Sequence, residues 1–273
     1  MNFKDLKLVV CDIDGTLVTN QRELTTKTKE VINRLLGLGI YFGIASGRSI
    51  DQQLADQAKN WGFDQNFELL IGMNGAQMWD GINDIRHDYY LLKREWIKEI
   101  IELMEPFDLN PFIYADGKMM CKKLDDLTMT SSKNNKTSVI VAGDIAELYE
   151  KENAKIMFRI SEDKIDDVLS YVNSNKSEYY KAFKTQTTML EFTDSRVSKA
   201  VALHEFCKAN DIKADQVMSF GDMTNDNELL AYSGFGVCLA NGSEDTKAVA
   251  DYVTTKTNDE EGFADFILNH VLS

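Results

Sequence analysis

The chain has 273 residues, 44% of them hydrophobic, so it can bury a sizeable core in one large or two modest domains. Its formal net charge of −14 argues against a nucleic-acid partner, because binding to phosphate backbones needs lysines and arginines that displace counterions. Its apolar runs are too short for a membrane span, and its first residues lack a secretory-signal pattern, so we expect a cytoplasmic protein with no membrane partner. The sequence contains no CxxC pair, which favours reduced, buried thiols at Cys11, Cys121, Cys207 and Cys238.

The first eighty residues alternate between strand and helix patterns. Leu6–Cys11 is a continuous apolar run, typical of a strand buried on both faces of a parallel sheet. Residues 24–39 predict a helix that ends at a glycine, and residues 40–45 predict a second strand. Helical spacing then runs from Ile50 to Trp61, before a third strand within residues 68–76. This alternation predicts one half of an open α/β sheet.

The middle of the chain mixes helical and strand patterns differently. Helices are expected at 93–107 and 162–175, and strands at 154–160 and 187–192, which indicates a separate α+β domain. The α/β alternation resumes after it, with helices expected at 198–210 and 227–234 and strands at 216–220, 234–240 and 251–255. The sequence therefore predicts a catalytic core made of residues 1–83 and 190–273, interrupted by an insert of residues 84–189.

Acidic residues follow two of the predicted core strands. Asp12 and Asp14 end the first strand, where residues two apart share a face and where open α/β sheets bind ligands. Two close carboxylates repel each other unless a cation or a donor relieves them. Asp222, Asn225 and Asp226 follow a later strand, in "FGDMTND". Because these are hard oxygen ligands without a nearby His or Cys, they indicate Mg²⁺.

Two further segments favour an anion beside this metal. The turn "ASGRS" offers the hydroxyl of Ser46 and backbone amides at a helix start. Lys199, at the start of the helix after the insert, adds a cation. Carboxylates, Mg²⁺, a lysine and a hydroxyl together suit a phosphoryl group, whose transfer depends on positioning and charge neutralisation. Taken singly, an Asp-Gly or Asn-Asp pair is usually only a turn or a helix cap.

The four segments "DIDGTL", "ASGRS", "VSKAVAL" and "GDMTND", in this order around an insert of this size, resemble the motifs of the haloacid dehalogenase (HAD) superfamily. The chain is most similar to the Cof-type phosphatases, which carry a large α+β (type IIB) cap, and "IGMNGA", "LANGSEDTKAVADYVT" and "TNDEEG" resemble later signatures of that branch. The resemblance implies a doubly wound parallel-sheet, Rossmann-like core with an inserted α+β cap. In that branch the cap closes over the catalytic edge and selects the substrate.

The resemblance also implies a role for each motif residue. Asp12 would be the nucleophile that forms an aspartyl-phosphate, and Asp14 the general acid and then the general base. The catalytic set would be Asp12, Asp14, Ser46 and Lys199. The phosphate would be bound by Ser46, Gly47, Lys199 and Asn225. Mg²⁺ would be held by Asp12, Asp14 (through its main-chain carbonyl), Asp222 and Asp226, the last as a ligand or as a partner of one.

The expected activity is Mg²⁺-dependent hydrolysis of small phosphomonoesters, such as sugar phosphates, by a monomer or weak homodimer. Two alternatives remain open: a sugar phosphomutase that needs a bisphosphate activator, and a non-catalytic sensor of a phosphorylated metabolite. Arg48 could form a structural salt bridge or touch the substrate. Four insert residues could reach the substrate or simply be solvated: Tyr114, Lys118, Lys122 and Lys123.

Overall fold

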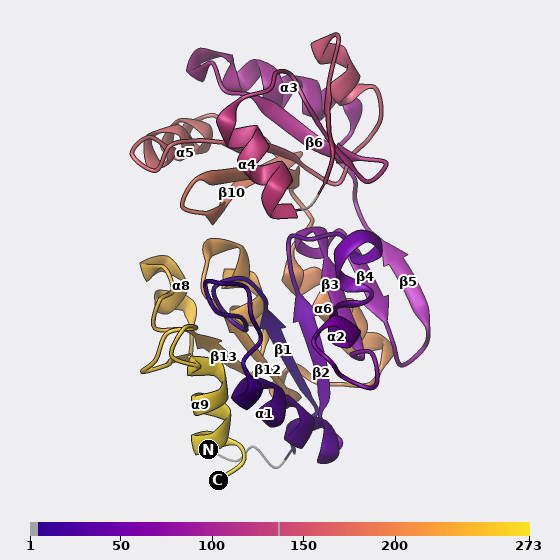
Figure 1. The fold of residues 1–273 in the computed structure, drawn as a ribbon, viewed down its shortest axis with the longest axis vertical. Helices are drawn as coiled ribbons and strands as arrows, with labels where there is room; N and C mark the ends of the chain where they lie inside the picture. Colours follow the sequence, from indigo (N-terminus) through magenta and orange to yellow (C-terminus); the bar gives the residue numbers. More distant parts are fainter. Residues whose placement is uncertain (1–4, 136) are drawn as a thin grey trace. The chain divides into compact units, whose positions relative to one another are not determined.

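The computed structural model describes residues 5–135 and 137–273, which divide into two compact units (Figure 1). The core unit comprises the chain up to Tyr89 together with Ser198–Ser273, and the insert unit is Tyr90–Val197. The sequence placed these boundaries at 83/84 and 189/190. The observed boundaries lie further along the chain because residues 85–88 pair with the core sheet, whereas residues 189–194 pair within the sheet of the insert.

The described part of the core unit has an eight-stranded sheet in the order β14-β13-β12-β1-β2-β3-β4-β5. Six neighbouring strands are parallel, which confirms the predicted parallel core: β1 (Leu8–Asp12), β2 (Tyr41–Ala45), β3 (Leu69–Gly72), β12 (Val217–Gly221), β13 (Phe235–Cys238) and β14 (Tyr252–Val253). The sequence did not predict the antiparallel hairpin that extends one edge, β4 (Gln77–Asp80) and β5 (Ile85–Asp88).

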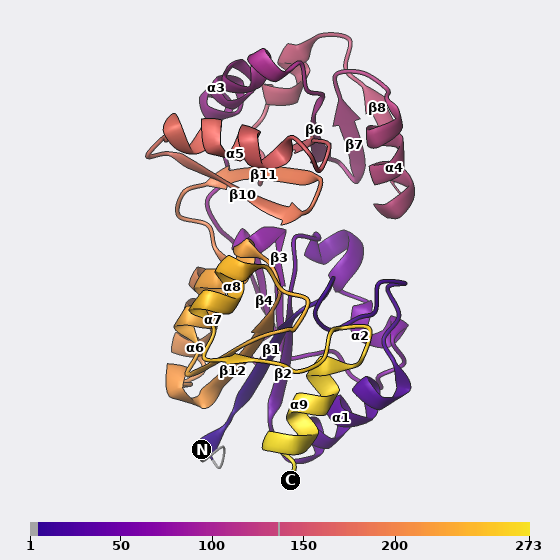
Figure 2. The ribbon, with the colours of Figure 1, turned by 90° about the vertical axis from the view of Figure 1, so that its left-hand side faces the viewer.

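Helices cover both faces of this sheet, as the alternation of side chains along β1 shows. Val9 and Cys11 belong to the apolar cluster that includes α1 (Thr26–Gly37) and α9 (Gly262–His270). Leu8 and Val10 belong to the opposite cluster, with α6 (Lys199–Ala209) and α7 (Asn227–Tyr232) (Figure 2). Complete burial of such a side chain stabilises the fold by about 1.5–3 kcal/mol. The core is therefore doubly wound, with β1 at its centre.

Two helix starts are fixed by hydroxyl caps. Thr25 accepts a hydrogen bond from the Thr28 N–H (3.2 Å) at the start of α1, and Ser198 accepts one from the Val201 N–H (3.2 Å) at the start of α6. The remaining described helices of the core unit are short: η2 (Ile50–Leu54), α2 (Gln57–Asn60), η3 (Met73–Gly75), η6 (Ala214–Gln216), η7 (Thr224–Asp226) and α8 (Glu244–Val249). No helix in the described ranges is long and apolar enough to cross a membrane.

The described part of the insert unit has its own six-stranded sheet, in the order β10-β11-β9-β6-β7-β8. Its strands are β6 (Pro111–Ala115), β7 (Lys118–Cys121), β8 (Val139–Val141), β9 (Ile156–Arg159), β10 (Tyr180–Gln186) and β11 (Met189–Asp194). Its helices are α3 (Arg94–Met104), η4 (Glu105–Phe107), α4 (Asp126–Asn135), η5 (Ile145–Tyr149) and α5 (Ile165–Ser174). One apolar cluster joins α3 and α5 to the sheet. The α+β character predicted for the insert is confirmed.

Candidate active site

The centre of the site is a buried lysine between two carboxylates at the carboxyl end of β1. Asp12 lies on the face of β1 that also carries Leu8 and Val10, toward α6. Lys199 is the first residue of α6 and is fully buried. Its Nζ lies 2.5 Å from Asp12 Oδ1 and 2.6 Å from Asp226 Oδ1. Burial disfavours the ammonium, but the two carboxylates outweigh it and raise the pKa of Lys199 above its usual value.

Three buried carboxylates form a group that could hold a metal ion. Asp12, Asp222 and Asp226 each offer one oxygen, and these oxygens all lie within 4.8 Å of one another. Burial, reinforced by the neighbouring acids, raises the pKa of Asp12 well above its usual range and that of Asp222 to about 7. When all three carboxylates are ionised, the one lysine does not balance their charge, and a divalent cation would neutralise the excess and favour the ionised forms. The oxygen-only donor set fits Mg²⁺.

Asp226 differs from the other two acids because both of its oxygens are engaged by the protein. Oδ1 pairs with Lys199, while Oδ2 accepts hydrogen bonds from the N–H groups of Asp222 (3.0 Å) and Met223 (3.2 Å). Within the described structure, Asp12 Oδ2 and Asp222 Oδ2 accept no hydrogen bond. The geometry thus favours Asp12 and Asp222 as ligands and gives Asp226 the task of holding the loop after β12.

The carboxylate of Asp14 lies outside this acidic group. It forms a bidentate ion pair with Arg48 (Nη2–Oδ1 2.5 Å, Nε–Oδ2 3.1 Å), and Arg22 Nε is 3.9 Å from the same carboxylate. We expected Asp12 and Asp14 to share one face, but β1 ends at Asp12 and the chain turns, so alternation does not continue. Of the two roles left open for Arg48, the structure shows the salt bridge. A metal contact through the Asp14 main-chain carbonyl stays a prediction.

The turn after β1 packs against Asp222. Gly15 has φ +86°, and a Cβ at this position would collide with the Asp222 carboxylate, so both backbone and space require glycine. Thr16 Oγ1 donates a hydrogen bond to Asp222 Oδ1 (2.7 Å). Thr16 therefore joins the turn after β1 to the loop after β12.

The turn after β2 brings the predicted phosphate-binding residues to the same edge of the core sheet. Ser46 is buried directly after β2, with its N–H bonded to the Ile71 carbonyl (2.8 Å) and its Oγ accepting from the Arg48 N–H (3.2 Å). Its carbonyl accepts from the N–H of Asn74 (3.0 Å), and the Asn74 Oδ1 accepts from Asn225 Nδ2 (3.2 Å). Gly47 follows Ser46 directly. Asn74 thus links the turn after β2 to the loop after β12.

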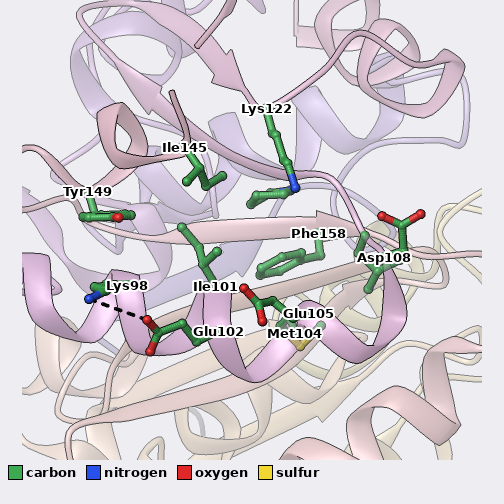
Figure 3. A pocket seen from close by; sticks show the side chains of 12 residues that line it. Lys98, Ile101, Glu102, Met104, Glu105, Asp108, Lys122, Ile145, Tyr149 and Phe158 are labelled. Atoms are coloured by element: carbon green, nitrogen blue, oxygen red, sulfur yellow. Dashed lines mark ion pairs between the residues drawn. The ribbon is translucent and has the colours of Figure 1, made fainter. Parts of the chain in front are cut away.

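A pocket of about 240 Å³ lies within the insert unit, between α3 and η5 (Figure 3). Apolar side chains such as Ile101, Met104 and Phe158 line it, and Lys98 forms an ion pair with Glu102 (3.6 Å) at its side. Of the four insert residues that the sequence suggested as substrate contacts, Lys122 lines this pocket. The predicted site residues of the core do not line this pocket, so it is separate from the acidic group.

Comparison with known proteins gives one family match along most of the chain. The model of haloacid dehalogenase-like hydrolases matches residues 9–267. Among curated proteins, two 5-amino-6-(5-phospho-D-ribitylamino)uracil phosphatases of Bacillus subtilis are similar. YitU is 24% identical, with 95% of this chain and 96% of YitU covered, and YcsE is 26% identical, with 98% and 97% covered.

Solved structures show the same fold. SMU.1108c from Streptococcus mutans has a TM-score of 0.84 at 22% identity, covering 98% of this chain and all of that one (100%). The HAD subclass IIB sugar phosphatase BT4131 has a TM-score of 0.79 at 22% identity, covering 96% of this chain and 98% of that one. The likeness extends over both units, so the fold predicted from the motifs is confirmed.

Proposed function

Because the chain belongs to the haloacid dehalogenase-like hydrolases, we propose that it is a Mg²⁺-dependent phosphatase that acts through an aspartyl-phosphate on Asp12. Hydrolysis of phosphoric monoesters is supported by the family and by the phosphatases that match nearly the whole chain. The observation that supports Mg²⁺ dependence and an aspartyl-phosphate is the contact between Lys199 Nζ and Asp12, beside a group of three carboxylates. In the proposed mechanism this arrangement would supply a nucleophile, a cation for the phosphoryl oxygens and carboxylates for a metal ion.

In the first step, one oxygen of the Asp12 carboxylate attacks phosphorus. The bond between phosphorus and the leaving alcohol oxygen breaks, and Asp14 donates the proton that this oxygen takes up. The ion pair between Asp14 and Arg48 therefore has to open before Asp14 acts as an acid. Lys199 neutralises the charge of the transferring phosphoryl oxygens, and the hydroxyl of Ser46 donates a hydrogen bond to them.

In the second step, water attacks the aspartyl-phosphate. Asp14, now a carboxylate, takes a proton from the water, the bond between phosphorus and Asp12 breaks, and inorganic phosphate leaves. Asp12 and Asp222 would hold Mg²⁺, with Asp226 supporting the loop. When bound, Mg²⁺ would neutralise phosphoryl charge and orient the group for in-line attack.

The proposed substrates are small sugar or polyol phosphates. YitU and YcsE are named for a substrate whose phosphate lies on a ribityl chain, and BT4131 is described as a sugar phosphatase. We assign the choice among such compounds to the insert unit, because the acidic group, Lys199 and Ser46 all belong to the core unit and serve only the phosphoryl group.

The test measures phosphate release from a panel of sugar and polyol phosphates, with Mg²⁺ and with EDTA. Asp12→Asn and Asp14→Asn should each lose at least about 10³-fold in kcat/KM, since each removes a reacting group. Asp64→Asn removes an exposed carboxylate in the core unit and should change nothing. Release that persists in EDTA or in Asp12→Asn would contradict the mechanism. A strict need for a bisphosphate activator would favour a mutase, and tight binding without turnover would favour a sensor.

A further inference from the structure

The loop after β13, residues 239–243, is bonded to both loops that carry acidic residues. The Ser243 N–H donates to the main-chain carbonyl of Asp222 (2.8 Å). On the other side, Asn241 Nδ2 donates to the main-chain carbonyl of Gly15 (2.8 Å). This loop therefore joins the turn after β1 to the loop after β12, at the point where Gly15 packs against the Asp222 carboxylate.

The amide of Asn241 is used at both ends. Its Oδ1 accepts a hydrogen bond from the N–H of Asn258 (2.9 Å), while its Nδ2 faces the Gly15 carbonyl. Because one neighbour is a donor and the other an acceptor, only one orientation of the amide satisfies both. Asn258 is buried, and its Nδ2 donates to the carbonyl of Val18 (2.9 Å). The two asparagines thus hold the turn after β1 at Gly15 and again at Val18.

The position of the Gly15 carbonyl affects both sides of the metal-binding group. Gly15 follows Asp14, whose main-chain carbonyl is a predicted ligand, and precedes Thr16, whose hydroxyl holds Asp222 Oδ1 (2.7 Å). A shift of this turn would move one predicted ligand and release the hydrogen bond on another. Asn241 itself is exposed, so losing its amide leaves the Gly15 carbonyl open to water and costs little stability.

We propose that Asn241 is a positioning residue for the metal and phosphoryl site, acting through Gly15 to fix the spacing between the turn after β1 and Asp222. This inference rests on the proposed function, because it concerns how the same site holds its metal. It also gives a task to the segment "LANGSEDT", which the mechanism does not use. Partners that orient metal ligands typically contribute 10–100-fold, roughly, to metal affinity or activity.

The experiment compares Asn241→Ala and Asn241→Asp with the unchanged chain. The aspartate variant keeps an acceptor for the Asn258 N–H but has no donor for Gly15, so it isolates the proposed contact. Asn60→Ala, at an exposed asparagine at the end of α2, is the matched control. The dissociation constant of Mg²⁺ is measured by calorimetry on metal-free protein. kcat/KM is measured at saturating Mg²⁺, and Tm in EDTA.

Both Asn241 variants should bind Mg²⁺ about tenfold more weakly, with Tm in EDTA changed by no more than about 2 °C. Asn60→Ala should match the unchanged chain in all three measurements. An unaltered dissociation constant for Mg²⁺ in either Asn241 variant would overturn the inference. A loss of Mg²⁺ affinity that is fully accounted for by a fall in Tm would also overturn it. If the unchanged chain binds Mg²⁺ but hydrolyses nothing, the proposed function fails alone. If it binds no Mg²⁺, both fail.

Discussion

At the scale of single residues, the sequence predicted the members of the acidic group, but not how they share the work. Asp12, Asp222 and Lys199 meet because the carboxyl ends of parallel strands and the start of α6 lie at one edge, which strand order alone implies. The proposed division between Asp222 as a ligand and Asp226 as a loop support depends on which carboxylate oxygens the protein already binds. The contacts of Lys199 with Asp226 and of Thr16 with Asp222 join residues 27 and 206 positions apart, and such contacts have no sequence pattern.

The placement of Asp14 shows where a pattern rule stops. Alternation along a strand holds only while the strand continues, and β1 ends at Asp12. The partner of Asp14 is Arg48, which is 34 residues away in the sequence, in the turn after β2. Neighbouring strand ends could have suggested this pair, because both turns lie at the same edge of the sheet.

The raised pKa of Asp222 predicts a pH dependence of stability in the metal-free protein. Its folded pKa of about 7 exceeds the unfolded value of about 4, so the folded chain binds the proton more tightly. Stability from this group is therefore complete below about pH 4 and is lost as pH rises toward 7, by about 2 kcal/mol or more. Mg²⁺ should offset the loss, because it binds the carboxylate form.

Urea unfolding at pH 5 and pH 8 in EDTA measures this effect. The unchanged chain should lose more stability between the two pH values than Asp222→Asn, which has no charge at this position. Adding Mg²⁺ at pH 8 should stabilise the unchanged chain and have little effect on the variant. An equal loss of stability between pH 5 and pH 8 in the two proteins would show that Asp222 does not titrate in this range.

At the scale of elements, the positions of the core strands and helices followed from sequence periodicity, whereas the hairpin at one edge of the core sheet did not. The parallel strands are continuous apolar runs, and α1 has a cap and an apolar face, so both were predictable. The β4–β5 hairpin was missed because its residues, such as Arg86 and Asp88, read as polar loop. Pairing with β4, rather than intrinsic propensity, makes β5 a strand.

The start of α6 provides a prediction that separates stability from catalysis. Ser198 caps α6 one residue before Lys199, whereas Thr25 caps α1, a helix that carries none of the predicted site residues. Ser198→Ala and Thr25→Ala should each destabilise the fold by about 1 kcal/mol. Only Ser198→Ala should also lower kcat/KM, by about tenfold, because it loosens the turn that positions Lys199 against Asp12.

Denaturant unfolding and steady-state kinetics on both variants check this pair. Thr25→Ala serves as the control for an equal loss of a helix cap. If the two variants kept the same kcat/KM, the start of α6 would not determine the position of Lys199. If both lost activity in proportion to stability, the effect would be on folding rather than on the site.

At the scale of the whole molecule, the interrupted core was predictable from the change in patterning, but its boundaries were not. The insert follows a short edge hairpin and ends after a strand of its own, so neither junction coincides with a shift in composition. The match of one family model to residues 9–267 agrees with a single evolutionary unit that includes the insert.

The insert unit should fold when expressed alone as residues 90–197. Its described strands all come from this segment, and it has its own apolar cluster around Ile156, Phe158 and Leu190. Circular dichroism should show a cooperative thermal transition that Mg²⁺ does not shift, because the segment lacks the acidic group. Phe158→Ala should remove about 3–5 kcal/mol and abolish the transition. A segment without a transition would show that the insert depends on the core.

The position of β1 at the centre of the sheet has a consequence for synthesis on the ribosome. β1 pairs with β2 soon after both emerge, but its other neighbour, β12, begins only at Val217. Until then one edge of this buried, largely apolar strand has no partner. Asp12 also lacks its ion-pair partner, because Lys199 lies 187 residues further along the chain. The insert is complete before Lys199 is made, so the insert can fold before the core does. During this time the proposed nucleophile, Asp12, is still without its counter-charge. The nascent protein thus gains its chemistry late, because Lys199, Asp222 and Asp226 all follow the insert in the sequence.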